Sequence, residues 1–162
     1  MIGKQVDEVS FVLNSKPVTV QVEARRTLLD CLRDDLQSYG THVGCEHGVC
    51  GCCNVMLDGD LIRSCLIFAW QVEGRSVVTI EGIETEEGLS DVQEAFVEKH
   101  ALQCGYCTPG MIMTVEHLIQ ENPSPSREQL VDAISGNLCR CTGYQQILEA
   151  AQSAIDVRSG RG

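Results

Sequence analysis

Eight of the ten cysteines in this 162-residue chain form two groups whose spacing suits metal binding. The first group has the pattern C-x4-C-x2-C and a fourth cysteine after a gap: Cys45, Cys50, Cys53 and Cys65. The second has C-x2-C, a long gap and C-x-C: Cys104, Cys107, Cys139 and Cys141. Plant-type ferredoxins hold a 2Fe–2S cluster with the first spacing. The two groups therefore predict two 2Fe–2S clusters and one-electron chemistry.

The segments around both groups suit an anionic cluster. Three glycines lie among the first cysteines, and glycine lets backbone N–H groups approach sulfur closely. Cys65 is expected to arrive from the end of a hairpin strand. In the second group, Cys104 and Cys107 precede a helix that Thr108 should cap, with Pro109 as its first residue. The N-terminus of a helix favours negative charge, so thiolates are stabilised there.

Zinc and disulfides are the competing explanations for so many cysteines. Structural zinc sites usually combine two Cys-x2-Cys pairs, whereas neither group here has two such pairs. A disulfide scaffold is typical of secreted chains, but the first eight residues are polar and lack the pattern of a signal segment. Iron–sulfur binding is therefore favoured for both groups, and a cytoplasmic location is expected. A zinc-stabilised interaction module would be colourless, whereas an iron–sulfur protein is red-brown.

Two cysteines remain outside the groups. Cys31 falls beside leucines of an expected helix, where a free cysteine is most often a small buried apolar residue. Cys52 adjoins Cys53 and could in principle replace it as a ligand. The C-x4-C-x2-C spacing selects Cys50 and Cys53 instead, so we expect Cys52 to be a spare thiol.

Charge and hydropathy exclude two classes of partner. The net charge is −11 with no long block of one sign, whereas a nucleic-acid surface needs a basic stripe. The longest apolar runs fall short of the 18 or so residues that a membrane-spanning helix needs. We therefore expect no nucleic-acid partner and no membrane span.

The first half of the chain reads as a small β-rich unit around one helix. Alternating apolar residues predict strands and a hairpin, and Thr27 is placed to cap the helix. The expected elements are strands over 8–13 and 18–22, a helix over 28–37, a hairpin over 54–64 that turns at Asp58-Gly59, and a strand over 77–80. This arrangement predicts a β-grasp, ferredoxin-like domain over residues 1–82.

The second half reads as helical. Residues 83–89 are acidic and glycine-containing, as a linker would be. Helical periodicity then predicts four helices: 91–100, 109–121, 127–134 and one that follows Gly143. The predicted fold class is α+β, with an all-α four-helix domain over residues 90–162.

Three segments together resemble the signatures of one family. They are GCEHGVCGCC at 44–53, QCGYCTPGM at 103–111 and GNLCRCTGY at 136–144. The chain is similar to the small iron–sulfur subunit of molybdenum hydroxylases, the xanthine oxidase family. It most resembles the separate small subunits of bacterial three-subunit enzymes, such as aerobic carbon monoxide dehydrogenase and the N-heterocycle dehydrogenases. The position of Cys52 is often alanine in that family, so this thiol is a departure.

The resemblance implies a function and partners. It implies that the eight cysteines bind two 2Fe–2S clusters and that no substrate chemistry occurs on this chain. It implies a large subunit with molybdopterin, often the cytosine dinucleotide form, and a medium subunit with FAD, assembled as a dimer of heterotrimers. Electrons would pass from molybdopterin to the helical-domain cluster, then to the ferredoxin-like cluster, then to FAD. Gln103 and Cys141 would lie near the pterin.

The sequence leaves the substrate open. An N-heteroaromatic ring, a purine alkaloid, an aldehyde and carbon monoxide all fit the resemblance. The alternative function is a free-standing two-cluster ferredoxin that serves several partners. A separate helical domain with a second cluster favours the enzyme subunit over the carrier.

Overall fold

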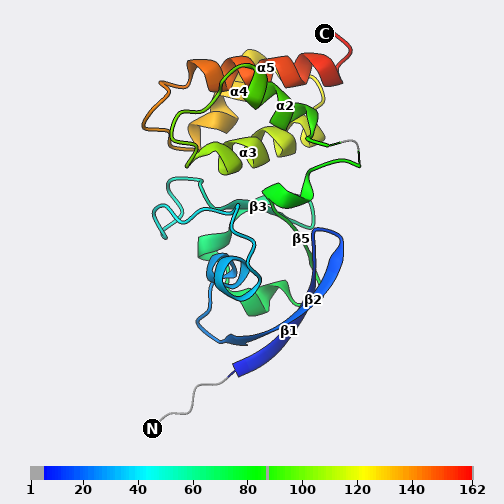
Figure 1. The fold of residues 1–162 in the computed structure, drawn as a ribbon, viewed down its shortest axis with the longest axis vertical. Coiled ribbons are helices and arrows are strands. Elements are labelled where there is room, and N and C mark those ends of the chain that lie inside the picture. The colour runs from blue at the N-terminus through cyan, green and yellow to red at the C-terminus, as the bar shows by residue number, and fades with distance from the viewer. Residues whose placement is uncertain (1–5, 87, 162) are drawn as a thin grey trace.

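The computed structural model describes residues 6–86 and 88–161 of the chain. A sheet-containing half lies below a helical half in Figure 1. The mixture of a five-stranded sheet with helices confirms the expected α+β class. Residues 1–5 of the expected first domain, residue 87 of the expected linker and residue 162 lie outside the described residues. None of the described helices is long and apolar enough to cross a membrane.

The sheet is built mainly from two hairpins. Its strands are β1 (Val6–Leu13), β2 (Lys16–Glu23), β3 (Asn54–Leu57), β4 (Asp60–Arg63) and β5 (Ser76–Val78), in the order β2-β1-β5-β3-β4. Asn14 and Ser15 turn the first hairpin with positive φ, and Asp58 and Gly59 turn the second. Such two-residue turns match the twist of the strands. The predicted hairpin over 54–64 is confirmed. The strands expected over 8–13 and 18–22 form a second hairpin, and β1 also pairs in parallel with β5.

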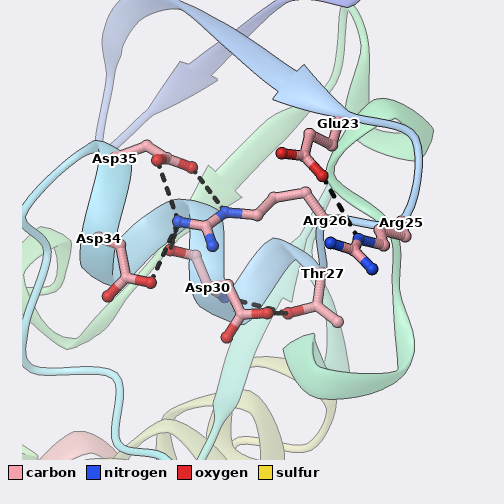
Figure 2. Close-up of polar contacts among 7 residues, drawn as sticks. All are labelled: Glu23, Arg25, Arg26, Thr27, Asp30, Asp34 and Asp35. Carbon is pink, nitrogen blue, oxygen red and sulfur yellow. Dashed lines mark hydrogen bonds and ion pairs between the residues drawn. The ribbon is translucent and has the colours of Figure 1, made fainter. Parts of the chain in front are cut away.

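The helix on the sheet is shorter and less regular than expected. Helix α1 (Leu28–Asp30) passes into a π-helical stretch, Cys31–Asp35, instead of continuing to residue 37. Thr27 caps α1 as predicted, since its hydroxyl accepts from the Asp30 N–H at 3.1 Å. Figure 2 shows Arg26 reaching across the π turn to the carboxylates of Asp34 and Asp35, at 3.1 and 2.9 Å.

Four helices make up the rest: α2 (Asp91–Glu98), α3 (Thr108–Glu121), α4 (Arg127–Ser135) and α5 (Gln145–Arg158). Ser90 and Ser126 cap α2 and α4 in capping boxes with the glutamines three residues later. The predicted cap of α3 is wrong. Cys107 occupies the cap position, so Thr108 is the first helical residue and Pro109 the second. Proline is tolerated there because the first N–H groups of a helix have no partner within it.

The two halves have separate apolar cores that meet at α3. One core fills the space beneath the sheet and around α1, and the other lies among α2, α3, α4 and α5. Helix α3 packs against β3 and β4, and α3 is the helix nearest the sheet half in Figure 1. Cys107 of the second group caps the N-terminus of α3, so this packing sets where the two cysteine groups lie.

Candidate metal centres

The first cysteine group lies in the loop before β3 and in the turn after β4. Cys50, Cys53 and Cys65 are buried, and Cys45 is partly exposed. Cys65 does not sit on a strand as predicted. It lies in a single 3-10 turn, Ser64–Leu66, that begins where β4 ends. The hydroxyl of Ser64 donates to the carbonyl of Cys53 at 2.8 Å and fixes this turn against the cysteine loop.

The thiols of the first group associate in pairs. The sulfur of Cys45 accepts a hydrogen bond from the backbone N–H of Cys50 at 3.4 Å, and the thiol of Cys65 lies beside that of Cys53. Burial opposes ionisation of Cys45, but backbone hydrogen bonds from His47 and Cys50 outweigh it and lower its pKa to about 6. Burial, then the contact with Cys53, raises the pKa of Cys65 to about 12. Backbone N–H groups thus already stabilise negative charge at the Cys45 end of this group.

The second group shows the same pairing. The sulfurs of Cys104 and Cys141 lie 3.5 Å apart at the surface. The thiols of Cys107 and Cys139 lie beside each other deeper in the site. Burial opposes ionisation of Cys139, but hydrogen bonds from the side chain and backbone of Thr142 lower its pKa, and the Thr142 hydroxyl lies 3.1 Å from the sulfur.

Two pairs in each group suit a two-iron core better than a single ion. Over residues 6–86 and 88–161, no three histidine, cysteine or acidic side chains form a group that could hold one metal ion. A zinc site needs four ligands around one point. A 2Fe–2S core instead shares four cysteines between two irons. Metal–sulfur bonds of about 2.3 Å at tetrahedral angles place two sulfurs about 3.8 Å apart, close to the separation of Cys104 and Cys141.

Unpartnered polar atoms lie beside the same groups. In the described part of the chain, three buried side-chain atoms have no hydrogen-bond partner: Thr41 Oγ1, Thr108 Oγ1 and Asn137 Nδ2. Thr41 shortly precedes the first group, Thr108 follows Cys107 directly, and Asn137 lies two residues before Cys139. Buried donors are rarely left unpaired in folded proteins, and cluster sulfurs accept hydrogen bonds. The surroundings of both groups therefore fit an iron–sulfur core.

A hydrogen-bonded seam connects the two groups, and apart from the cysteine motifs no sequence pattern indicates it. The N–H of Leu138 donates to the carbonyl of Cys50 at 2.9 Å. The guanidinium of Arg63 donates to the carbonyl of Gly48 at 3.3 Å and to that of Gly136 at 2.7 Å. Arg63 therefore bridges the loop of the first group and the segment that leads into the second.

Backbones also touch directly at this seam. A Cβ placed on Gly110, in the first turn of α3, would lie 2.2 Å from the carbonyl oxygen of Gly51. Gly51 itself has a φ of +75°, and a Cβ there would meet the side chain of Asn137 at 2.6 Å. Only glycine allows both approaches.

A second link involves an aromatic pair. The hydroxyl of Tyr106 donates to the carbonyl of Val43, and Nδ1 of His42 lies 2.8 Å from the carbonyl of Tyr106. The two rings stack with centroids 4.8 Å apart. Since Tyr106 lies between Cys104 and Cys107, this contact joins the second group to the segment that precedes Cys45.

The expected pterin-side residues lie at an exposed edge of the second group. Gln103, Cys104 and Cys141 are all exposed, and the contact between the two cysteine sulfurs places Gln103 and Cys141 on the same edge. Apolar side chains on the same loops are also exposed: Leu102, Tyr106 and Leu138. This edge has the composition of a surface that another protein covers.

Comparisons with known proteins agree with these sites. Residues 11–77 match the 2Fe-2S iron-sulfur cluster binding domain, and residues 79–152 match the 2Fe-2S binding domain. The chain is 50% identical over 147 residues to the nicotine 6-hydroxylase small subunit of Paenarthrobacter nicotinovorans, covering 91% of this chain and 88% of that one. It is 47% identical to caffeine dehydrogenase subunit gamma of a Pseudomonas species, covering 90% and 89%.

A solved structure extends the likeness to the whole fold. The crystal structure of quinoline 2-oxidoreductase from Pseudomonas putida 86 contains a chain that matches with a TM-score of 0.90 and 45% identity. The match covers 98% of this chain and 99% of that one. On these grounds the protein is an oxidoreductase component and belongs to the small iron–sulfur subunits of multi-subunit molybdenum hydroxylases.

Proposed function

We propose that this chain conducts electrons from a molybdopterin centre on a large partner subunit, through two 2Fe–2S clusters, to FAD on a medium subunit. The observation that carries the proposal is the pairing of thiols in both groups, together with the hydrogen-bonded seam between them. When bound, each cluster accepts and releases one electron at a time. The side chains of this chain then hold the cores, exclude water from the first one and fix the spacing of the two.

We assign eight cysteines as ligands, four to each cluster. In the first cluster Cys45 and Cys50 would share one iron, and Cys53 and Cys65 the other. In the second cluster the pairs would be Cys104 with Cys141 and Cys107 with Cys139. The pairwise contacts support this division.

The exposed edge of the second group is the proposed electron entrance. Cys141 and Gln103 would contact the pterin, which we expect in its cytosine dinucleotide form. Their exposure supports the assignment, because a cofactor on another chain can reach them. Electrons would leave from the first cluster toward FAD.

The proposed substrates are N-heteroaromatic compounds, including purine alkaloids. Support comes from the names of similar proteins, which refer to nicotine, caffeine and quinoline. The substrate would be hydroxylated on the large subunit. Aldehydes and carbon monoxide are the competing substrates within the same function.

The proposed organisation has two domains in a larger assembly. We place a ferredoxin-like domain at residues 1–82, a linker at 83–89 and a four-helix domain at 90–162. The assembly would be a cytoplasmic dimer of heterotrimers.

Native purification tests the function. We expect the chain to co-purify with a molybdenum-containing subunit and a flavin-containing subunit, with about four iron atoms per chain and two distinct paramagnetic centres after dithionite reduction. The purified complex should reduce a dye with an N-heteroaromatic substrate. Isolation as a lone monomer with both clusters would favour the free-standing ferredoxin instead. Absence of iron and inorganic sulfide from anaerobic preparations would refute both functions.

A further inference from the structure

The second site contains a hydroxyl in contact with one of its proposed ligands. Oγ1 of Thr142 lies 3.1 Å from the sulfur of Cys139. Both residues are half-buried and belong to the loop between α4 and α5. The direction in which the hydroxyl proton points decides whether it can stabilise negative charge on that sulfur.

A neighbouring backbone group determines this direction. The N–H of Tyr144 donates to the same Oγ1 of Thr142 at 3.1 Å. A backbone N–H can only donate, so it occupies a lone pair of the hydroxyl and leaves the single O–H to find an acceptor. A cysteine binds a metal as its thiolate and then has no proton of its own to donate. The O–H of Thr142 is therefore directed to the sulfur of Cys139.

An unusual turn holds that backbone N–H in place. Gly143 and Tyr144 have φ values of +65° and +69°, a conformation that a bulky side chain rarely adopts. The ring of Tyr144 packs against the helical core. Its hydroxyl accepts from the N–H of Cys139 at 2.9 Å and donates to the carbonyl of Asn137 at 3.1 Å. Tyr144 thus fixes Cys139 with its side chain and Thr142 with its backbone.

The first site has a donor of a different kind. There the sulfur of Cys45 accepts from the main-chain N–H of Cys50 at 3.4 Å. A main-chain donor stays in place when its side chain is changed, whereas the donor from Thr142 belongs to a side chain. The second site can therefore lose this hydrogen bond without losing a ligand.

We propose that the hydroxyl of Thr142, oriented by Tyr144, donates a hydrogen bond to the ligand sulfur of Cys139 and raises the reduction potential of the second iron–sulfur site. The inference rests on the proposed function, because it needs the second cluster in place. A donor to a ligand sulfur stabilises the reduced cluster more than the oxidised one, since reduction adds a negative charge. The second site is the proposed electron entrance, so the hydroxyl makes it a stronger electron acceptor.

The test is a redox titration of the purified complex, in which the paramagnetic signals of the two clusters are followed separately. Thr142→Val keeps the size of the side chain but removes the O–H. At a fixed potential, we expect the ratio of reduced to oxidised second cluster to fall about tenfold, which corresponds to about 59 mV for one electron. The ratio for the first cluster should stay unchanged. Thr142→Ser retains a hydroxyl and should restore most of the ratio.

Thr114→Val is the matched control. The hydroxyl of Thr114 is buried at the seam, where it donates to the carbonyl of Gly110 at 2.8 Å. Its removal should lower the free energy of unfolding and leave the ratios of both clusters unchanged. An equal shift of the second cluster in this control would overturn the donor role, because a general disturbance of α3 would then explain the effect.

The remaining outcomes separate the inference from the proposed function. Unchanged ratios in Thr142→Val, with both signals present, would overturn the donor role and leave the proposed function intact. Loss of the second signal in Thr142→Val would also overturn it, because the hydroxyl would then be needed to assemble the site. Absence of both signals from the wild-type complex would overturn the donor role and the proposed function together.

Discussion

The amide of Leu138 donates a hydrogen bond of 2.9 Å to the carbonyl of Cys50, and this contact joins the two cysteine groups. Leu138 directly precedes Cys139, and Cys50 belongs to the first group. The path from one sulfur to the other therefore follows covalent bonds and crosses one hydrogen bond. Electrons tunnel more readily along such a path than across an empty gap. The contact also ties the segment before Cys139 to the loop of the first group.

Single ligand substitutions should remove one cluster at a time. Cys53→Ser should abolish the signal of the first cluster and Cys107→Ser that of the second, because each cluster needs all four of its cysteines. Iron should fall from about four to about two atoms per chain. Each variant should also unfold at a lower temperature, since cluster binding contributes to folding.

Paramagnetic resonance, iron analysis and thermal unfolding check this assignment. Cys31→Ser is the control and should retain both signals. Retention of both clusters by either ligand variant would contradict the assignment.

The sequence predicted the cysteine groups and most elements because those features are local. Alternation along residues 8–13 and 18–22 and the Asp58-Gly59 turn identify hairpins without knowledge of the rest of the fold. Helical periodicity identifies the helices of the second half in the same way. The π-helical stretch after Asp30 was missed because the i to i+5 bond from Leu36 to Cys31 has no sequence pattern of its own.

The seam could not be predicted because it depends on contacts between distant segments. Arg63 and Gly136 are 73 residues apart, and neither residue type at its position signals the other. Gly51 and Gly110 appear in the cysteine motifs, but only the structure places them against each other. The position of Cys65 after its strand, instead of on it, likewise depends on how the turn meets the cysteine loop.

Gly110→Ala should weaken the contact between the two halves. The new Cβ would lie 2.2 Å from a backbone oxygen of Gly51, which has little freedom to move. Overpacking of this kind costs about 1–3 kcal/mol. Denaturant unfolding of the chain with both clusters bound should show this loss of unfolding free energy. The magnetic interaction between the two reduced clusters should also weaken.

Gly59→Ala is the matched control for this substitution. Gly59 also has a positive φ, but a Cβ there would meet no atom within 4 Å. It should lower stability through backbone strain and leave the interaction between the clusters unchanged. An unaltered interaction in Gly110→Ala would contradict the role of the seam in setting their spacing.

Arg63→Lys should lower the free energy of unfolding although it preserves the charge. The guanidinium of Arg63 donates to three acceptors at once: Asn54, Gly48 and Gly136. The ammonium of lysine cannot reproduce this planar set of donors. We expect a loss of about 2–3 kcal/mol in the free energy of unfolding, as a hydrogen bond to a charged group is worth about 1.5–3 kcal/mol.

An exposed arginine provides the comparison. Arg75 pairs with Asp58 near the sheet turn, and both side chains are over 40% exposed. Arg75→Lys should change stability by less than about 1 kcal/mol. Equal effects of the two substitutions would show that Arg63 acts only as a surface charge.

A buried ion pair makes a further prediction for the helical half. Glu116 on α3 is 4% exposed and accepts from Arg158 on α5 at 2.7 Å and from Ser90 at 2.8 Å. Arg158 also forms a two-point contact with Asp91 at the start of α2. The guanidinium of Arg158 therefore connects α5 with both α2 and α3.

Removing the arginine should lower the free energy of unfolding more than neutralising the glutamate does. Arg158→Met leaves the buried carboxylate of Glu116 without a cation, which costs about 3–5 kcal/mol. Glu116→Gln leaves Arg158 paired with Asp91 and should cost about 1.5–3 kcal/mol. The double variant should be more stable than the sum of the single losses predicts, because Arg158→Met then leaves no charged Glu116 unpaired. Denaturant unfolding of the four proteins measures the coupling, and strict additivity would show that the two side chains act independently.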